Sequence, residues 1–214
     1  MATELKPISI TRPGLLLVED QASVRFYINF LHALSIRNVY VQEYCGINNL
    51  QNKLRLVKKA TGFNAVKALG IVRDAEDDSS RALQSLNSAL SNNSFPAVAS
   101  HNSFITAGHL SVGAFIMPGF GTQGSLEDLL LSSVADDPAF PCVESFMDCI
   151  SKKVQQDRQP KNKSKARMLA FLAGMHEPVN RIDVASGQQV WNFSHNTFSE
   201  FAAFLRNLTE LSGS

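Results

Sequence analysis

The chain has 214 residues, of which 44% are hydrophobic and 18% are charged, and its formal net charge is +1. This composition excludes a disordered or collagen-like chain and suits a globular domain with a sizeable core. The near-neutral charge also excludes a general polyanion-binding surface, so a nucleic acid would need a local basic patch.

Strands and helices are expected to alternate along the first half of the chain. The run Gly14 to Glu19 predicts a buried strand, and the apolar stripe from Val24 to Leu34 predicts a helix directly after it. The same pattern then occurs twice more. The expected strands are 14–19, 38–44 and 68–73, and the expected helices are 20–34, 48–59 and 79–90.

The second half is turn-rich at first and then mainly helical. The apolar run Val112 to Met117 predicts a further strand, and a short edge strand is expected at 97–100. The expected helices are 125–131, 138–154, 165–173 and 193–208.

Repeated strand–helix units indicate a parallel sheet with right-handed crossovers. We therefore predict an α/β fold, a three-layer, Rossmann-like arrangement with a mostly parallel sheet of about four to five strands and flanking helices. Residues 1–214 are expected to form a single domain, with a core at 14–135 and a helical C-terminal extension at 138–211.

The sequence predicts a cytoplasmic protein. It has no N-terminal signal region and no apolar run as long as a membrane span, so no membrane partner is expected. Its three cysteines form no disulfide framework and no zinc-site spacing, which favours reduced thiols.

Four carboxylates occupy positions 74–78, directly after the third predicted strand. In an extended backbone Asp74 and Glu76 point to the same side and repel each other. Oxygen ligands of this kind suit Mg²⁺ or Mn²⁺. The alternative is that one or two of these acids cap the following helix, since the positive end of a helix favours carboxylates.

A glycine-rich loop at 119–124 precedes a second acidic segment, but it lacks the ending of a P-loop. Ser125 and Asp128 have the spacing of a capping box. Glu127 is not needed for that cap, which leaves its carboxylate available to a site.

Residues 152–167 carry seven basic residues and one acid. They could form a solvated linker. They could also form a rim that contacts nucleic-acid phosphates through Lys161, Lys163 and Arg167, because Lys and Arg dominate such contacts.

Four features in order resemble the Toprim domain of topoisomerases, primases, RNA-maturation nucleases and overcoming-lysogenization-defect (OLD) nucleases. They are a strand-end Glu19, the pair Asp74-x-Glu76, the pair Ser125-x-Glu127 and the basic segment Lys163/Lys165. The chain most resembles small stand-alone Toprim-like proteins of unassigned function, over residues 14–208.

This resemblance implies a metal-dependent nuclease that hydrolyses phosphodiester bonds of DNA or RNA with two Mg²⁺ or Mn²⁺ ions. Glu19 would be a metal ligand or general acid–base, and Lys165, or Lys163, would stabilise charge on the phosphate. The implied metal-binding residues are Glu19, Asp74 and Glu76, with Asp77 or Asp78 as a replacement for Glu76, and Ser125 and Glu127, which belong to a second metal.

Two alternatives stay open. Asp20 stands where these proteins usually have glycine, which leaves a non-catalytic module that binds metal or nucleic acid or regulates a partner. Leu15 to Asp20 also resembles a response-regulator receiver with Asp74 as phospho-acceptor, but Met117 and Pro118 lie far beyond the receiver spacing. A homodimer with the phenylalanine-rich C-terminal helix in its interface is also left open.

Overall fold

In the computed structural model, which describes residues 9–119 and 121–213, the chain folds around a five-stranded sheet. The order across the sheet is β2-β1-β3-β5-β4, with β4 antiparallel to β5 and the other neighbours parallel. All residues of β1 and β5 are buried, as expected for strands covered on both faces. The strands are β1 (Gly14–Val18), β2 (Val39–Glu43), β3 (Ala68–Asp74), β4 (Ser103–Ala107) and β5 (Leu110–Met117).

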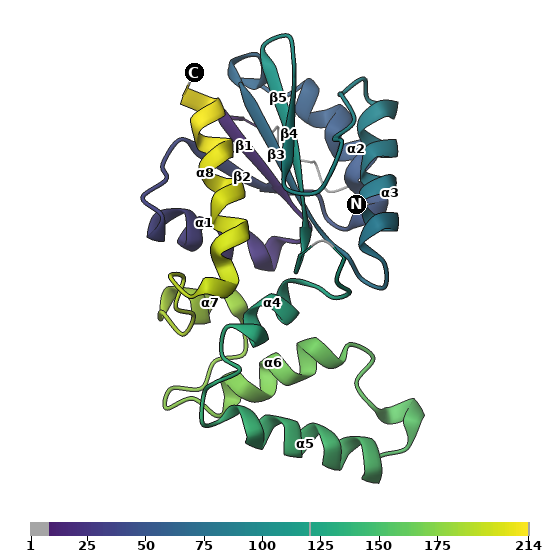
Figure 1. Cartoon of the computed structure of the whole chain (residues 1–214), viewed down its shortest axis with the longest axis vertical. Coiled ribbons are helices and arrows are strands. Elements are labelled where there is room, and N and C mark those ends of the chain that lie inside the picture. Colours follow the sequence, from purple (N-terminus) through teal and green to yellow (C-terminus); the bar gives the residue numbers. More distant parts are fainter. Residues whose placement is uncertain (1–8, 120, 214) are drawn as a thin grey trace, which may run out of the picture.

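Helices cover both faces of the sheet, so the core has three layers (Figure 1). α2 (Ile47–Lys58) and α3 (Ser79–Asn92) pack on one face, and α1 (Gln21–Ala33) and α8 (Ser199–Gly213) pack on the other. The predicted α/β, three-layer, Rossmann-like fold with a mostly parallel sheet is confirmed.

The remaining helices lie beyond the carboxyl ends of the parallel strands. α4 (Leu126–Ser132) leads into a hairpin of α5 (Phe140–Lys153) and α6 (Lys163–Ala173), which projects away from the sheet (Figure 1). α7 (Ile182–Gly187) then returns the chain to α1. Ligands gather at this edge of open α/β sheets, so these helices cover the place where a site is expected.

Two details of the predicted layout are wrong. The edge strand expected at 97–100 is β4, at Ser103–Ala107. Val98 is instead buried, and the Asn87 side chain takes both hydrogen bonds that a strand would need, from the Val98 N–H (2.8 Å) and to its carbonyl (2.9 Å). In addition, α7 was not predicted, because its six residues are too few to show an apolar stripe.

The phenylalanine-rich face of α8 is part of the core. Phe201 and Phe204 are at most 1% exposed and pack against Phe115 of β5. This face of α8 is therefore closed to a partner chain. Within the described residues, none of the helices has both the length and the apolar character of a membrane span.

Gly70 allows α8 to approach the sheet. A Cβ atom there would lie 3.1 to 3.2 Å from the side chains of Leu16, Phe204 and Leu208. We expect Gly70→Ala to lower the free energy of unfolding by about 1–3 kcal/mol through overpacking. Gly174→Ala is the control, because its Cβ atom would meet nothing closer than 3.4 Å and we expect a change within about 0.5 kcal/mol. Urea denaturation measures both, and equal losses would contradict this account of Gly70.

Candidate active site

Two neighbouring strand ends bring Glu19 and Asp74 together. β1 and β3 are adjacent and parallel, so their carboxyl ends lie at the same edge of the sheet. Asp74 is the last residue of β3, and Glu19 directly follows β1. The buried Tyr44 hydroxyl lies 3.4 Å from Glu19 Oε2 and 3.1 Å from the Val72 carbonyl oxygen, and it can donate to either.

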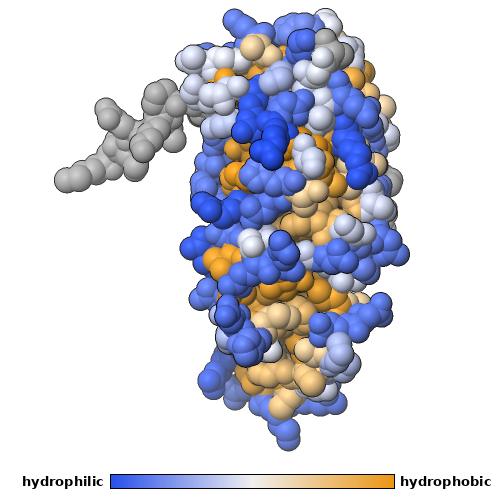
Figure 2. All heavy atoms as spheres, turned by 90° about the vertical axis from the view of Figure 1, so that its left-hand side faces the viewer, coloured by the Kyte–Doolittle hydropathy of each residue, from blue (hydrophilic) through white to orange (hydrophobic). Residues whose placement is uncertain are grey.

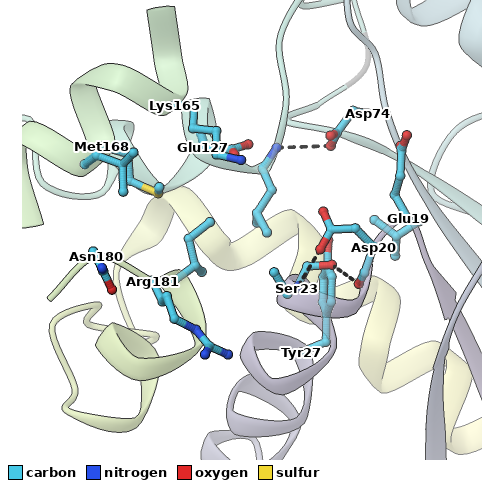
Figure 3. A pocket seen from close by; sticks show the side chains of 15 residues that line it. Glu19, Asp20, Ser23, Tyr27, Asp74, Glu127, Lys165, Met168, Asn180 and Arg181 are labelled. Carbon is cyan, nitrogen blue, oxygen red and sulfur yellow. Dashed lines mark hydrogen bonds between the residues drawn. The ribbon is translucent and has the colours of Figure 1, made fainter. Parts of the chain in front are cut away.

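The first turn of α4 adds a third carboxylate, Glu127. Ser125 and Asp128 form the predicted capping box, in which the Ser125 N–H donates to Asp128 Oδ2 at 2.8 Å. The Ser125 hydroxyl also lies 2.9 Å from Glu127 Oε2. The N–H of Leu126 donates to Asp74 Oδ1 at 3.1 Å (Figure 3). The start of α4 is therefore fastened to the end of β3.

The three carboxylates line a cavity of about 190 Å³ between the strand ends and helices α1, α4, α6 and α7. Figure 3 shows Glu19 and Asp74 on one side of it and Met168, Asn180 and Arg181 on the other. The cavity thus has an acidic side formed by the core and an opposite side formed by the helical extension.

Burial and nearby negative charge disfavour the charged forms of Asp74 and Glu19. Burial, and then the charges of Glu19 and Glu127, hold the pKa of Asp74 well above its ordinary value, although the Leu126 N–H opposes the shift. Burial also raises the pKa of Glu19, although a hydrogen bond from the Asp74 backbone opposes it. A bound cation would relieve both the burial cost and the repulsion.

Lys165 is the cation best placed to act here. It reaches the cavity from α6, and among the described residues no carboxylate oxygen lies within 4.0 Å of its ammonium group. The guanidinium of Arg181 is already engaged, since it donates to both carboxylate oxygens of Asp183 at 2.9 and 2.6 Å. That ion pair lowers the pKa of Asp183.

The donor set of the cavity fits a hard divalent cation, because Mg²⁺ and Mn²⁺ prefer carboxylate oxygens. The ligands are not assembled in advance, however. In the part of the chain that the structure describes, no group of three or more His, Cys, Asp or Glu side chains is close enough to hold a metal ion. Ion binding would therefore require the carboxylates to turn toward one another.

Four of the residues predicted for the site meet in this cavity. Glu19, Asp74 and Glu127 arrive from β1, β3 and α4, and Lys165 arrives from α6. They are separated widely in sequence, so their meeting follows from the parallel sheet and from the return of α6 to α4.

Glu76 does not line this cavity, contrary to the expected alternation with Asp74. Its backbone is left-handed (φ 53°), and it forms a bridge with Gly124 through hydrogen bonds of 2.9 and 2.8 Å. The strand has therefore ended before Glu76, and the Glu76 side chain lines a neighbouring depression with Arg73 and Asp78. The charge of Glu76 still contributes to the raised pKa of Glu19 and Asp74.

Asp78 and Ser125, both predicted as metal ligands, have structural roles instead. Asp78 is the N-cap of α3 and accepts from the N–H groups of Ser80 and Arg81, at 2.9 and 3.0 Å. The alternative interpretation of this acid, as a helix cap, is the one observed. Ser125 is 7% exposed, and its hydroxyl faces Glu127 and Asp128 rather than the cavity.

The basic residues assigned to nucleic acid lie on the hairpin and differ in their surroundings. Lys161 and Lys163 are exposed. Arg167 instead donates to Glu144 of α5 at 2.8 Å, which holds the two helices of the hairpin together. The structure therefore leaves the two lysines, and not Arg167, open to a ligand.

The wall that faces the acids was not predicted from the sequence. Asn180, Arg181 and Ile182 come from the segment that enters α7, and Met168 and Leu169 come from α6. Tyr27, which lines the cavity from α1 and is 3% exposed, was not predicted either. The only signal in the sequence was the Arg181-x-Asp183 spacing, which is too short to be specific.

A family model described as "Protein of unknown function (DUF3226)" matches residues 13–210. No curated protein matches the chain. Similar solved structures include the C-terminal region of the Xanthomonas campestris pv. campestris OLD protein, at 12% identity over 94% of this chain and 96% of that chain, with a TM-score of 0.49. The C-terminal region of the Burkholderia pseudomallei OLD protein is 14% identical over 94% of this chain and 100% of that chain, with a TM-score of 0.47. OLD proteins are among the proteins that the sequence motifs resemble.

The raised pKa of Asp74 predicts that this carboxylate destabilises the metal-free protein. A folded-state pKa above the unfolded value favours folding at low pH, and that advantage is lost as the pH rises through the folded pKa. In EDTA, Asp74→Asn should therefore gain stability over the wild type as the pH is raised from about 4 to 8, by about 1.4 kcal/mol for each unit of pKa shift. Urea denaturation across this pH range measures the gain.

Asp78→Asn is the control, because its effect on stability should change with pH in the opposite direction. Capping of α3 lowers the pKa of Asp78, so its replacement should weaken the protein at neutral pH and have little effect at low pH. If the two variants show the same pH trend, the electrostatic account of the cavity is wrong.

Proposed function

Because the chain belongs to the DUF3226 family, whose description names no activity, we propose from its cavity that it is a divalent-metal-dependent hydrolase of nucleic-acid phosphodiester bonds. The observation that carries this proposal is the meeting of Glu19, Asp74 and Glu127 opposite a lysine that forms no ion pair among the described residues. Perturbed carboxylates of this kind in a cleft mark functional sites.

Each residue of the cavity has a role in this proposal. Glu19, Asp74 and Glu127 would hold Mg²⁺ or Mn²⁺, which when bound polarises a phosphoryl oxygen and lowers the pKa of water. Lys165 would place its positive charge where negative charge grows on the phosphate. The Leu126 N–H and the Ser125 hydroxyl donate to the carboxylates of Asp74 and Glu127, which would turn from these contacts to reach a common ion.

The resemblance implies two metal ions, and the cavity offers ligands for one of them more clearly than for the other. The three carboxylates of the cavity supply ligands for one ion. Ser125, which the resemblance assigns to the second, directs its hydroxyl at Glu127 and Asp128. The proposal therefore depends on the set Glu19, Asp74 and Glu127.

A non-catalytic module that binds metal or nucleic acid is the second candidate. Two observations favour it. The carboxylates are not preassembled around an ion position. In addition, Asp20 accepts from the Ser23 N–H at 2.7 Å as the N-cap of α1, so a helix cap stands where the resembling proteins have glycine. Such a module would bind the ion without cutting.

Addition of Mn²⁺ should raise the melting temperature of the protein, because an ion that binds only the folded state stabilises it, by about 2.7 kcal/mol at 100 times the Kd. Glu19→Gln and Asp74→Asn should abolish that rise and should also abolish Mn²⁺-dependent cleavage of DNA or RNA. Thermal shift and gel assays measure the two effects. Asp157→Asn, at an exposed acid of the extension, is the control and should behave as the wild type.

The two readouts separate the candidate functions. A thermal shift without cleavage of any nucleic acid would support the non-catalytic module. A flat thermal titration together with no cleavage would remove the metal site altogether.

Replacement of Lys161 and Lys163 by alanine should flatten the salt dependence of nucleic-acid binding. Each lost phosphate contact should reduce the slope of log K against log salt concentration by about 0.7 for single strands and 0.9 for B-DNA. Fluorescence anisotropy over a salt series measures the slope. Arg206→Ala, at an exposed cation of α8, should leave it unchanged, and equal slopes in all variants would disprove a role for the hairpin.

A further inference from the structure

We infer that the cavity receives an unpaired nucleotide, so that the substrate is a single strand or an unpaired end and not an intact duplex. This inference rests on the proposed function, because it names the substrate of that site. Three observations support the inference. They are the two helices that cover the cavity, α6 and α7, which we call its roof, the size of the cavity, and the apolar side chains on its far wall.

The roof is attached to the core at both ends. At the α6 end, the Ser164 hydroxyl donates to Asp128 Oδ1 of α4 at 2.6 Å. At the α7 end, the Asn29 side chain of α1 donates to the Ser186 hydroxyl at 2.8 Å, and α7 packs along α1. The two anchored helices therefore face the acids across the cavity and narrow the way in to them.

The cavity between the acids and the roof is small. Its volume of about 190 Å³ is below the roughly 300–1,000 Å³ of pockets that take drug-sized ligands. It can hold one phosphate with part of its nucleoside. A base pair would have to open before its strand could enter, a cost that an unpaired strand does not meet.

The far wall of the cavity offers apolar side chains to a sugar or base, beside the polar side chains of Asn180 and Arg181. Met168, Leu169 and Ile182 face the acids from the roof. Figure 2 shows further apolar surface at this level of the molecule, below the sheet. A backbone phosphate placed near Lys165 would bring its own nucleoside against this wall, whereas in a duplex the base stays stacked on its neighbours.

Ala22 gives a way to close the cavity without disturbing the core. It is exposed, lies in the first turn of α1 and lines the cavity, whereas its neighbour Gln21 is exposed in the same turn and does not line it. Ala22→Phe should narrow the space for a nucleotide. Gln21→Phe is the matched control.

The test measures binding of labelled oligonucleotides in Ca²⁺ by fluorescence anisotropy, with strand integrity checked on a gel. DNA and RNA are each offered as a single strand and as a blunt duplex of the same sequence. We expect the wild type and Gln21→Phe to bind the single strand at least about tenfold more tightly than the duplex, since a paired base would first have to leave its stack. Ala22→Phe should lose this preference.

Three results would overturn the inference: equal or tighter binding of the duplex, equal behaviour of Ala22→Phe and Gln21→Phe, or no binding of any oligonucleotide. Displacement of the strand by an equal concentration of nucleoside monophosphate would also overturn it, because the ligand would then be a free nucleotide. A parallel cleavage assay in Mn²⁺ separates it from the proposed function. If the protein prefers the single strand but cleaves nothing, only the proposed hydrolase function is wrong. If it cleaves the duplex and the single strand at the same rate, only the proposed preference for an unpaired nucleotide is wrong.

Discussion

The buried Asp74 lies with two further carboxylates in one small cavity, and the cost of carrying negative charge there is the constraint on which the rest of this structure depends. Glu19 and Asp74 are held by the strand ends, and Glu127 by the capped first turn of α4. None of the three has an ion-pair partner among the described residues, and the burial of Asp74 increases the cost. Carboxylates can be held this close together only if well-packed surrounding structure fixes their positions.

That packing comes from the hydrophobic core on both faces of the sheet, which reaches the cavity at Tyr27 and Val72. The strands that carry Glu19 and Asp74 are covered on one face by α2 and α3 and on the other by the aromatic cluster of α1 and α8. Phe30 and Phe201, for example, stack at 5.4 Å between ring centroids. Asp74 and Glu127 thus lie in a strand and a helix, and Glu19 lies one residue beyond β1; regular elements of this kind position a site with more precision than loops do.

The sequence was informative where side chains follow from regular structure. Parallel strands place their carboxyl ends at one edge, which is why Glu19 and Asp74 could be predicted to meet. It was uninformative where a distant partner decides a local conformation. The left-handed backbone of Glu76 depends on Gly124, far along the chain, and Asp78 could serve equally as ligand or cap until α3 was seen to begin beside it. Arg181 lay outside any recognisable pattern because α7 is so short.

The hydrogen bond between Ser164 and Asp128 connects the α5–α6 hairpin to the acidic side of the cavity. Asp128 also receives the Ser125 N–H, and the Ser125 hydroxyl reaches Glu127, so α6 is linked to the acidic side of the cavity through a short polar chain. Lys161 lies three residues before Ser164, so the cations at the start of α6 and the Glu127 carboxylate are joined by a continuous set of hydrogen bonds at α4.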